Sequence, residues 1–232
     1  MSERQSSPAE SPLVHLIRPP REAAEGPRPG LLMLHGRGAD ELDLFGLADA
    51  LDPRLLVISA RAPFPLGPGY HWYELVQIGE PDNTTFFQSL GLLERFVEDS
   101  LQRYQVDPRR LYLLGFSQGA MMAGALTLSH PSWIAGSILL SGYLPLDTGL
   151  PVDREHLAGE PFFVAHGTRD TVVPIQLGRG TEEFLSQVGA DLTYREYSIA
   201  HQISLEEMED FGAWLSGLLD EQEGAGEGER RP

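Results

Sequence analysis

One serine lies in a short pattern that constrains the backbone around it. Residues 115–119 read Gly-Phe-Ser-Gln-Gly, so Ser117 stands between two glycines. An apolar run (111–114) precedes the pattern, and a run of small, helix-forming residues (120–126) follows it. A serine at a sharp strand-to-helix turn, with glycines where a side chain would crowd that turn, is the arrangement that lifts a nucleophilic hydroxyl above a sheet edge. The alternative, a flexible Gly/Ser connection, is disfavoured by the strand and helix patterns on both sides.

Strand-like and helix-like segments alternate along the rest of the chain. Compact apolar runs predict strands at 13–17, 31–35, 55–59, 111–114, 137–140, 162–165 and 193–197. Helical spacing of apolar residues predicts helices at about 42–51, 87–104, 118–129, 178–188 and 203–218. This alternation predicts an α/β fold with a mostly parallel central sheet and helices on both faces, in which ligands bind at the carboxyl ends of the strands.

The ends of the chain differ in composition from the middle. We expect a disordered N-terminus (1–11), one folded domain (12–219) and a disordered acidic tail (220–232), because the tail is rich in glycine and charge. Residues 60–86 interrupt the alternation with prolines, glycines and aromatic residues. Two interpretations of this segment stay open: a functional loop, or an irregular excursion that packs its aromatic rings on the core.

Composition excludes several kinds of chemistry. The 232 residues contain no cysteine and no lysine, which removes disulfides, thiolate chemistry, Schiff bases and a phosphate-binding loop lysine. A net charge of −17 disfavours nucleic acid and anionic membranes as partners. No apolar run is long enough for a membrane span, and the first residues lack a signal-peptide pattern. We therefore expect a cytoplasmic protein without stable membrane insertion.

A serine nucleophile needs a base and an acid that orients the base, and in this topology both follow the serine in the chain. Asp170 lies a few residues after the predicted strand 162–165, in a turn that Pro174 closes. A later histidine is then required, and His201 is the one that remains. His166 ends the same strand as a buried histidine that ties the strand to the Asp170 turn, in the interpretation that we favour.

Acyl transfer also needs donors for the developing oxyanion. The backbone N–H of Gln118 lies beside the serine, at the start of the predicted helix. The loop after residues 31–35 contains two glycines, and the backbone N–H of Arg37 in it is the natural second donor. The Arg37 side chain has two interpretations: an ion pair with Asp40 or Asp43, which we prefer, or a contact that narrows the mouth of a pocket.

With these pieces in place, the chain resembles the phospholipase/carboxylesterase family of α/β-hydrolases, the compact, capless group that includes acyl-protein thioesterases and small bacterial carboxylesterases. Four motifs carry the resemblance, in order: Leu34-His-Gly-Arg-Gly-Ala-Asp40, Gly115-Phe-Ser-Gln-Gly119, His166-Gly-Thr-Arg-Asp-Thr-Val-Val-Pro174 and Ala200-His-Gln-Ile203. The resemblance implies a catalytic triad of Ser117, Asp170 and His201 with an oxyanion hole at the Arg37 and Gln118 amides. It also points to Trp72, Val172 and Val173 as pocket walls. Ala200 departs from the family pattern, which has glycine there; if that position needs a positive φ, alanine has a cost.

These patterns favour a serine carboxylesterase that cleaves short to medium acyl esters through an acyl-enzyme and needs no cofactor or metal. Trp72 and Tyr73 from the 60–86 segment, with Val172 and Val173, are expected to form an apolar wall for the acyl chain. A lysophospholipase or acyl thioesterase with the same triad is the near alternative. A non-catalytic ligand-binding module on a hydrolase scaffold is the alternative from another class. We expect a small-molecule ester as the partner, and the sequence leaves a homodimer open.

Overall fold

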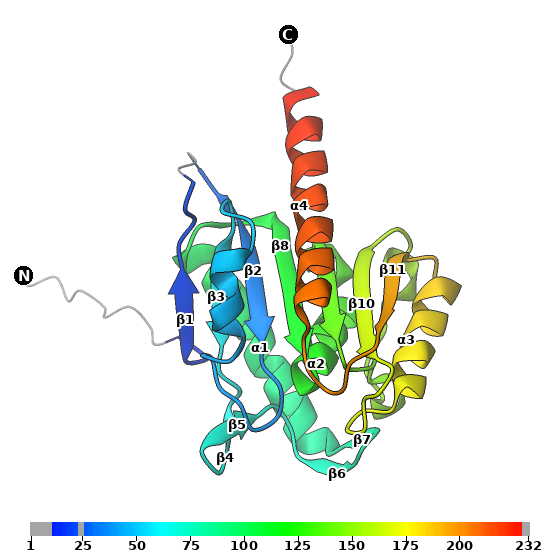
Figure 1. The fold of residues 1–232 in the computed structure, drawn as a ribbon. Helices are drawn as coiled ribbons and strands as arrows, with labels where there is room; N and C mark the ends of the chain where they lie inside the picture. Colours follow the sequence, from blue (N-terminus) through cyan, green and yellow to red (C-terminus); the bar gives the residue numbers. More distant parts are fainter. Residues whose placement is uncertain (1–10, 23–25, 229–232) are drawn as a thin grey trace, which may run out of the picture.

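The computed structural model describes residues 11–22 and 26–228, and these form one α/β layer structure around a central sheet (Figure 1). The sheet has seven strands in the order β1-β3-β2-β8-β9-β10-β11. The strands are β1 (His15–Arg18), β2 (Arg28–Leu34), β3 (Leu56–Ala60), β8 (Val106–Phe116), β9 (Gly136–Leu140), β10 (Pro161–Gly167) and β11 (Asp191–Tyr197). All neighbouring pairs are parallel except β1 with β3, so the predicted, mostly parallel sheet is confirmed.

Helices cover both faces of this sheet, as expected. The first face carries α1 (Asn83–Arg103), α2 (Gln118–Ser129) and α3 (Ile175–Gln187). The opposite face carries α4 (Leu205–Gly228), which crosses in front of the sheet in Figure 1, and the 3-10 helix η1 (Leu44–Ala50). Alternate residues of the central strands enter the two cores, because successive side chains of a strand point to opposite faces.

The pattern is visible in β2 and β8. Leu32 and Leu113 pack with the cluster under α1 and α2, whereas Leu31 and Leu114 pack with the cluster under α4. Burial on both sides explains why these strands read as continuous apolar runs. No cap domain interrupts the sheet, since residues 141–160 between β9 and β10 contain only two short 3-10 helices, η3 (Leu146–Thr148) and η4 (Arg154–His156).

The structure differs from our expectation at the C-terminal end. Residues 220–228, which we predicted to be disordered, continue α4 beyond the sheet edge (Figure 1). Arg54 forms ion pairs with Asp220 and Glu223, with nitrogen–oxygen distances of 2.7 and 2.9 Å. The Tyr112 hydroxyl donates a hydrogen bond to the Gln222 Oε1 at 2.9 Å. These contacts from residues distant in the sequence hold the start of the acidic segment on the fold. The remaining tail (229–232) and most of the predicted disordered N-terminus (1–10) lie outside the described residues.

The 60–86 segment forms two small hairpins rather than an irregular loop. One pairs β4 (Phe64–Leu66) with β5 (Gly69–His71), and the other pairs β6 (Leu75–Gln77) with β7 (Glu80–Pro81). Trp72 and Tyr73, which join the hairpins, are completely buried, while Val76 and Ile78 are exposed. Trp72 and Tyr73 therefore pack on the core, as one interpretation expected, and the second hairpin lies beside the candidate site, so a functional role of the segment stays a prediction.

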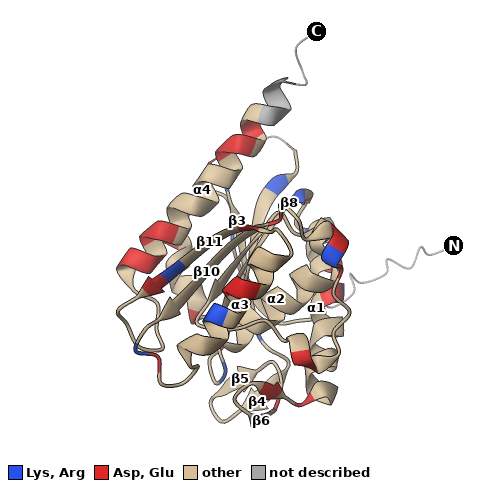
Figure 2. Ribbon diagram, turned by 90° about the vertical axis from the view of Figure 1, so that its right-hand side faces the viewer, with Lys and Arg blue, Asp and Glu red and all other residues tan. Residues whose placement is uncertain are grey.

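The surface is acidic, in keeping with the net charge of −17. Figure 2 shows acidic residues on several turns of α4, with few basic residues beside them. Within residues 11–22 and 26–228, no helix combines the length and the apolar character that crossing a membrane requires.

Candidate active site

Ser117 occupies the predicted sharp turn between β8 and α2. Its backbone has φ 55° and ψ −117°, a conformation that L-residues rarely adopt and that is held only where the surroundings enforce it. Both flanking glycines are sterically required. A Cβ at Gly115 would lie 2.3 Å from the carbonyl oxygen of Gly119, and a Cβ at Gly119 would lie 1.9 Å from that of Leu34. The turn therefore depends on glycine at both positions, and it presents the serine at the carboxyl end of a central strand.

His201 reaches this serine from the loop between β11 and α4. Its Nε2 lies 3.0 Å from the Ser117 Oγ, and its ring packs against Phe116 with 4.9 Å between the ring centroids. About one sixth of the His201 side chain is exposed (17%), so the imidazole is partly open to solvent and is held on one side by an aromatic ring.

Asp170 lies behind the histidine in the turn after β10. Its Oδ2 is 2.7 Å from the His201 Nδ1, and its Oδ1 accepts hydrogen bonds from the backbone N–H groups of Val172 and Val173 at 2.8 and 2.9 Å. The side chain is fully buried. A buried carboxylate that accepts from backbone amides and from an imidazole N–H fixes the Nδ1–H tautomer of the histidine. The structure thus brings the three predicted residues together in the order Asp170, His201, Ser117.

His166 has the structural place that we expected. It is completely buried, its Nε2 donates to the carbonyl oxygen of Val173 at 2.8 Å, and the Oδ2 of Asp170 is 3.6 Å away. This contact ties the end of β10 to the turn that carries Asp170. The histidine therefore supports the carboxylate and does not point at the serine.

The loop after β2 and the start of α2 place two backbone amides beside the serine. Arg37 and Gln118 line the same pocket as Ser117. Within the described part of the chain, neither backbone N–H donates a hydrogen bond to another protein group. The Gln118 amide is also the first of α2, where helix N–H groups lack partners and partial positive charge accumulates. Both amides are available to an oxygen that develops negative charge next to Ser117.

Side chains hold these two amides in place. The Gln118 Oε1 accepts from the backbone N–H of Trp72 at 3.1 Å, and its Nε2 donates to the carbonyl oxygen of Tyr73 at 2.9 Å. The indole N–H of Trp72 donates to the carbonyl oxygen of His35 at 2.9 Å. Trp72 is fully buried and does not line the pocket beside Ser117, which corrects its predicted place as a pocket wall. It lies behind the site and joins the two loops that carry the amides.

His35 is a buried residue at the loop after β2 whose contacts the sequence pattern did not identify. Its Nδ1 lies 2.7 Å from the carbonyl oxygen of Gly36, and its Nε2 accepts from the backbone N–H of Ala62 at 3.0 Å. Burial lowers the pKa of His35 and so favours the neutral ring that can accept this hydrogen bond. Its signal in the sequence was only a histidine at a strand end, which is not specific.

The pocket beside Ser117 has a volume of about 60 Å³. Its walls are mostly apolar: Tyr73, Leu75, Ile78, Met121, Tyr143, Val172 and Val173. Tyr73, Val172 and Val173, which we expected to form an apolar wall, line this pocket, and their contact with an acyl chain stays a prediction. The exposed Arg37 side chain also lines the pocket, and no ion pair joins it to Asp40 or Asp43 in the described chain, so the interpretation that we preferred for Arg37 is not supported.

Ala200, the departure from the family pattern, carries no backbone strain. Three described non-glycine residues have a positive φ, namely Gln105, Ser117 and Ser141, and Ala200 is not among them.

Directly after the His201 loop, α4 begins with a reciprocal cap. The Ser204 Oγ accepts from the Glu207 N–H at 3.1 Å, and the Glu207 Oε2 accepts from the Ser204 N–H at 3.3 Å. Burial raises the pKa of Glu207 to about 7.

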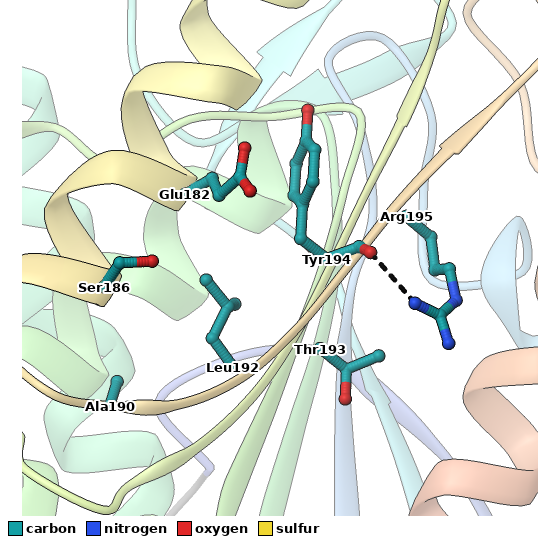
Figure 3. A pocket seen from close by; sticks show the side chains of 7 residues that line it. All are labelled: Glu182, Ser186, Ala190, Leu192, Thr193, Tyr194 and Arg195. Atoms are coloured by element: carbon teal, nitrogen blue, oxygen red, sulfur yellow. Dashed lines mark hydrogen bonds between the residues drawn. The ribbon is translucent and has the colours of Figure 1, made fainter.

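A larger hollow of about 580 Å³ lies at the sheet edge, where side chains of α3 face those of β11 (Figure 3). Glu182 and Ser186 come from the helix, and Leu192 and Tyr194 come from the strand. Arg195 donates to the carbonyl oxygen of Tyr194 at 3.2 Å. No histidine lines this hollow, so Ser186 has no base there. Volume alone therefore does not identify the site, and the chemistry favours the smaller pocket at Ser117.

Among the described residues, no group of three or more His, Cys, Asp or Glu side chains is arranged to hold a metal ion.

Comparison with curated proteins gives relatives at low identity over most of the chain. Acyl-protein thioesterase 1 of Kluyveromyces lactis is 27% identical over 212 residues, which cover 82% of this chain and 91% of that protein. A probable carboxylesterase, SOBER1-like, of Arabidopsis thaliana is 26% identical over 203 residues, with 80% and 77% covered.

Solved structures share the fold. A carboxylesterase from Mesorhizobium loti matches with a TM-score of 0.81 at 23% identity, covering 93% of this chain and all of that one. The Bacillus cereus carboxylesterase matches with a TM-score of 0.79 at 24% identity, covering 89% and 94%. The sequence model that describes phospholipases and carboxylesterases matches residues 21–219, nearly the whole described fold. The chain belongs to the phospholipase/carboxylesterase family of α/β-hydrolases.

Proposed function

We propose that the protein is a serine hydrolase that cleaves carboxylic esters of short to medium acyl chains through an acyl-enzyme. The observation that carries this proposal is the hydrogen-bonded series of side chains that ends on Ser117: 2.7 Å from Asp170 to His201 and 3.0 Å from His201 to the serine. A serine hydroxyl is a weak nucleophile at neutral pH, and this series supplies the base that activates it.

The geometry supports the following reaction. Asp170 accepts a hydrogen bond from the Nδ1–H of His201, so the Nε2 lone pair faces the Ser117 hydroxyl. The Oγ attacks the acyl carbon while its proton passes to Nε2, and the resulting oxyanion accepts hydrogen bonds from the Arg37 and Gln118 amides. The tetrahedral intermediate then collapses, and the alcohol leaves with the proton from Nε2. In the second half-reaction a water molecule, deprotonated by the same histidine, attacks the acyl carbon. The bond to the Ser117 Oγ then breaks, the histidine returns the proton to this oxygen, and the carboxylic acid leaves.

The pocket supports the proposed substrate class. Its apolar walls suit a hydrocarbon chain, and its volume of about 60 Å³ has room for only a few water-sized groups. Short and medium acyl chains therefore fit better than long ones. A thioesterase or lysophospholipase with the same triad is the second candidate, because relatives over most of this length are named acyl-protein thioesterases. The complete series of three side chains disfavours a non-catalytic binding module.

The test is a panel of acyl esters from acetyl to dodecanoyl, with the matching thioesters, assayed on the wild-type protein and on Ser117→Ala. We expect ester turnover that falls at least about 10³-fold in the variant, because members of such a triad act as a unit. Unchanged far-UV and near-UV circular dichroism is the folding control. Near-normal turnover by Ser117→Ala would refute the assignment, and faster cleavage of thioesters across the panel would favour the second candidate. A cytoplasmic location and a homodimer stay predictions from the sequence.

A further inference from the structure

Two cavities lie side by side at the carboxyl edge of the sheet. The first is the pocket of about 60 Å³ at Ser117, which we call the acyl pocket. The second has a volume of about 230 Å³ and is lined by residues that include Pro81, Leu144, Leu146, Leu177 and Thr181. The second cavity contains none of the three residues proposed for catalysis, and the proposed reaction does not use it.

The same three segments of the chain line both cavities in succession. In the second hairpin, Ile78 lines the acyl pocket and Gly79 lines the second cavity. Leu75 and Pro81 pair across this hairpin, and Leu75 lines the acyl pocket whereas Pro81 lines the second cavity. After β9, residue 142 lines the acyl pocket and residue 144 the second cavity. Around the start of α3, residues 172–173 line the acyl pocket and residues 176–177 line the second cavity. The two cavities are therefore neighbours that share walls.

Tyr143 is the residue that lines both cavities. The residue is only 9% exposed, and its hydroxyl accepts a hydrogen bond from the Gly79 backbone N–H at 3.1 Å. This bond spans from the loop after β9 to the tip of the second hairpin. Burial raises the pKa of the Tyr143 phenol to about 12, so the hydroxyl stays neutral at physiological pH.

The backbone on both sides of Tyr143 is fixed. A Cβ at Gly142 would lie 2.6 Å from the Cβ of Ala120, so this loop lies tightly against α2. The Leu144 N–H donates to the Thr181 Oγ1 at 3.0 Å, which ties the loop to α3. The ring is held at its base by these contacts and at its tip by Gly79, so it forms a wall rather than a mobile side chain.

We propose that Tyr143 is the specificity-determining residue that ends the acyl pocket, and that the second cavity is a closed extension able to take the distal part of a longer acyl chain once the ring is removed. This inference rests on the proposed function and adds a limit on chain length. Each methylene that stays buried improves binding roughly fourfold. With the ring in place, methylenes beyond the acyl pocket gain no such burial. Without it, the second cavity offers them an apolar path along Leu144, Leu146 and Leu177.

The experiment compares kcat/KM for acetyl to dodecanoyl 4-nitrophenyl esters in wild type, Tyr143→Ala and Tyr143→Phe. We expect Tyr143→Ala to move the optimum to a longer chain and to raise the ratio of decanoyl to butyryl activity at least about tenfold, since several methylenes become buried. Tyr143→Phe keeps the ring and is expected to keep the wild-type optimum. Tyr194→Ala, the same replacement in the hollow of Figure 3, is the matched control and should not change the ratio.

A second variant tests the route of the chain. Leu177 lines the second cavity but not the acyl pocket, so Leu177→Phe added to Tyr143→Ala refills that cavity. We expect the gain in the decanoyl-to-butyryl ratio to be lost again. If Tyr143→Ala does not fold, Tyr143→Leu, which keeps an apolar side chain, carries the same test. An unchanged length profile in the folded variants overturns this inference, as does a gain that Leu177→Phe leaves intact. Absence of ester turnover in wild type would overturn the proposed function instead.

Discussion

The indole N–H of Trp72 and the carbonyl oxygen of His35 lie 2.9 Å apart, in a hydrogen bond buried behind the candidate site. It joins the segment between the two hairpins to the loop after β2. The same tryptophan donates its backbone N–H to the Gln118 side chain at the start of α2. One residue thus holds both loops that carry the proposed oxyanion donors. It does so through its side chain on one side and its backbone N–H on the other, although it does not line the pocket.

We predict that Trp72→Phe lowers kcat more than it raises KM. Phenylalanine keeps much of the packing but removes the donor, so the buried carbonyl oxygen of His35 loses its partner, at a cost of about 1–3 kcal/mol. The Arg37 amide next to it then becomes less well placed for the oxyanion, which exists only during the reaction. Steady-state kinetics on one ester, with thermal unfolding alongside, measures both effects. Trp214→Phe on the opposite face is the control and should leave kcat unchanged, whereas equal losses in the two variants would argue against this positioning role.

We predict that Asp170→Asn lowers kcat by about 10⁴-fold with little change in fold. The Asn Oδ1 can still accept from the Val172 and Val173 amides, so the amide NH₂ group must face the His201 Nδ1. That contact favours the tautomer with hydrogen on Nε2, which cannot accept the serine proton. The measurement is single-turnover acylation, followed by the release of 4-nitrophenol. A loss below tenfold would contradict the role of the carboxylate in fixing the tautomer.

Much of the fold and of the candidate site was accessible from local sequence patterns. The parallel strands are buried on both faces, and this burial makes them continuous apolar runs. The turn at Ser117 leaves a direct trace in the sequence, because Gly115 and Gly119 have no room for a Cβ. Asp170 and His201 could be found because the order of elements brings the carboxyl ends of β10 and β11 to the same sheet edge. The strands and the turn could therefore be predicted from neighbouring residues alone, and Asp170 and His201 needed in addition the rule that ligands bind at the carboxyl ends of parallel strands.

The errors have a different origin. The sequence does not distinguish an aromatic loop residue that faces a ligand from one that faces the core. Trp72 faces the core, where it forms hydrogen bonds with two segments that are distant in the sequence. The tail beyond Leu219 has a disordered composition, but contacts from Arg54 and Tyr112 extend the helix. Tyr143, which lines both cavities, gave no signal, because the two cavities meet only in three dimensions. Long-range contacts decide all three cases.

We predict that Arg54→Ala frays the C-terminal part of α4 and destabilises the protein by about 1–3 kcal/mol. Burial by itself would raise the pKa of Asp52, but hydrogen bonds from Arg54 lower it to about 2, so removal of the arginine leaves a nearly buried carboxylate without its cation. The ion pairs to Asp220 and Glu223 are exposed, so each contributes little to the global free energy of unfolding, but both are contacts of the last turns of α4 and their loss acts there. Hydrogen exchange should quicken in residues 218–224, while ester turnover stays unchanged. The exposed Arg109→Ala is the control, and unchanged protection of this segment would contradict the prediction.

The last prediction concerns Glu207, whose buried carboxyl has a pKa raised to about 7 from an ordinary value of 4.5. Below the ordinary value both the folded and the unfolded chain hold the proton, so burial has no titration cost. Between the two values the folded chain keeps a proton that the unfolded chain gives up, and stability therefore falls as pH rises; above about 7 the full penalty remains, up to roughly 3 kcal/mol. Glu207→Gln keeps an acceptor for the Ser204 N–H and cannot ionise. We expect its free energy of unfolding relative to wild type to rise by about 1–3 kcal/mol between about pH 5 and pH 8, in urea titrations at several pH values. The exposed Glu209→Gln should show no such trend, and a parallel pH dependence in Glu207→Gln and wild type would show that the buried carboxyl does not titrate in this range.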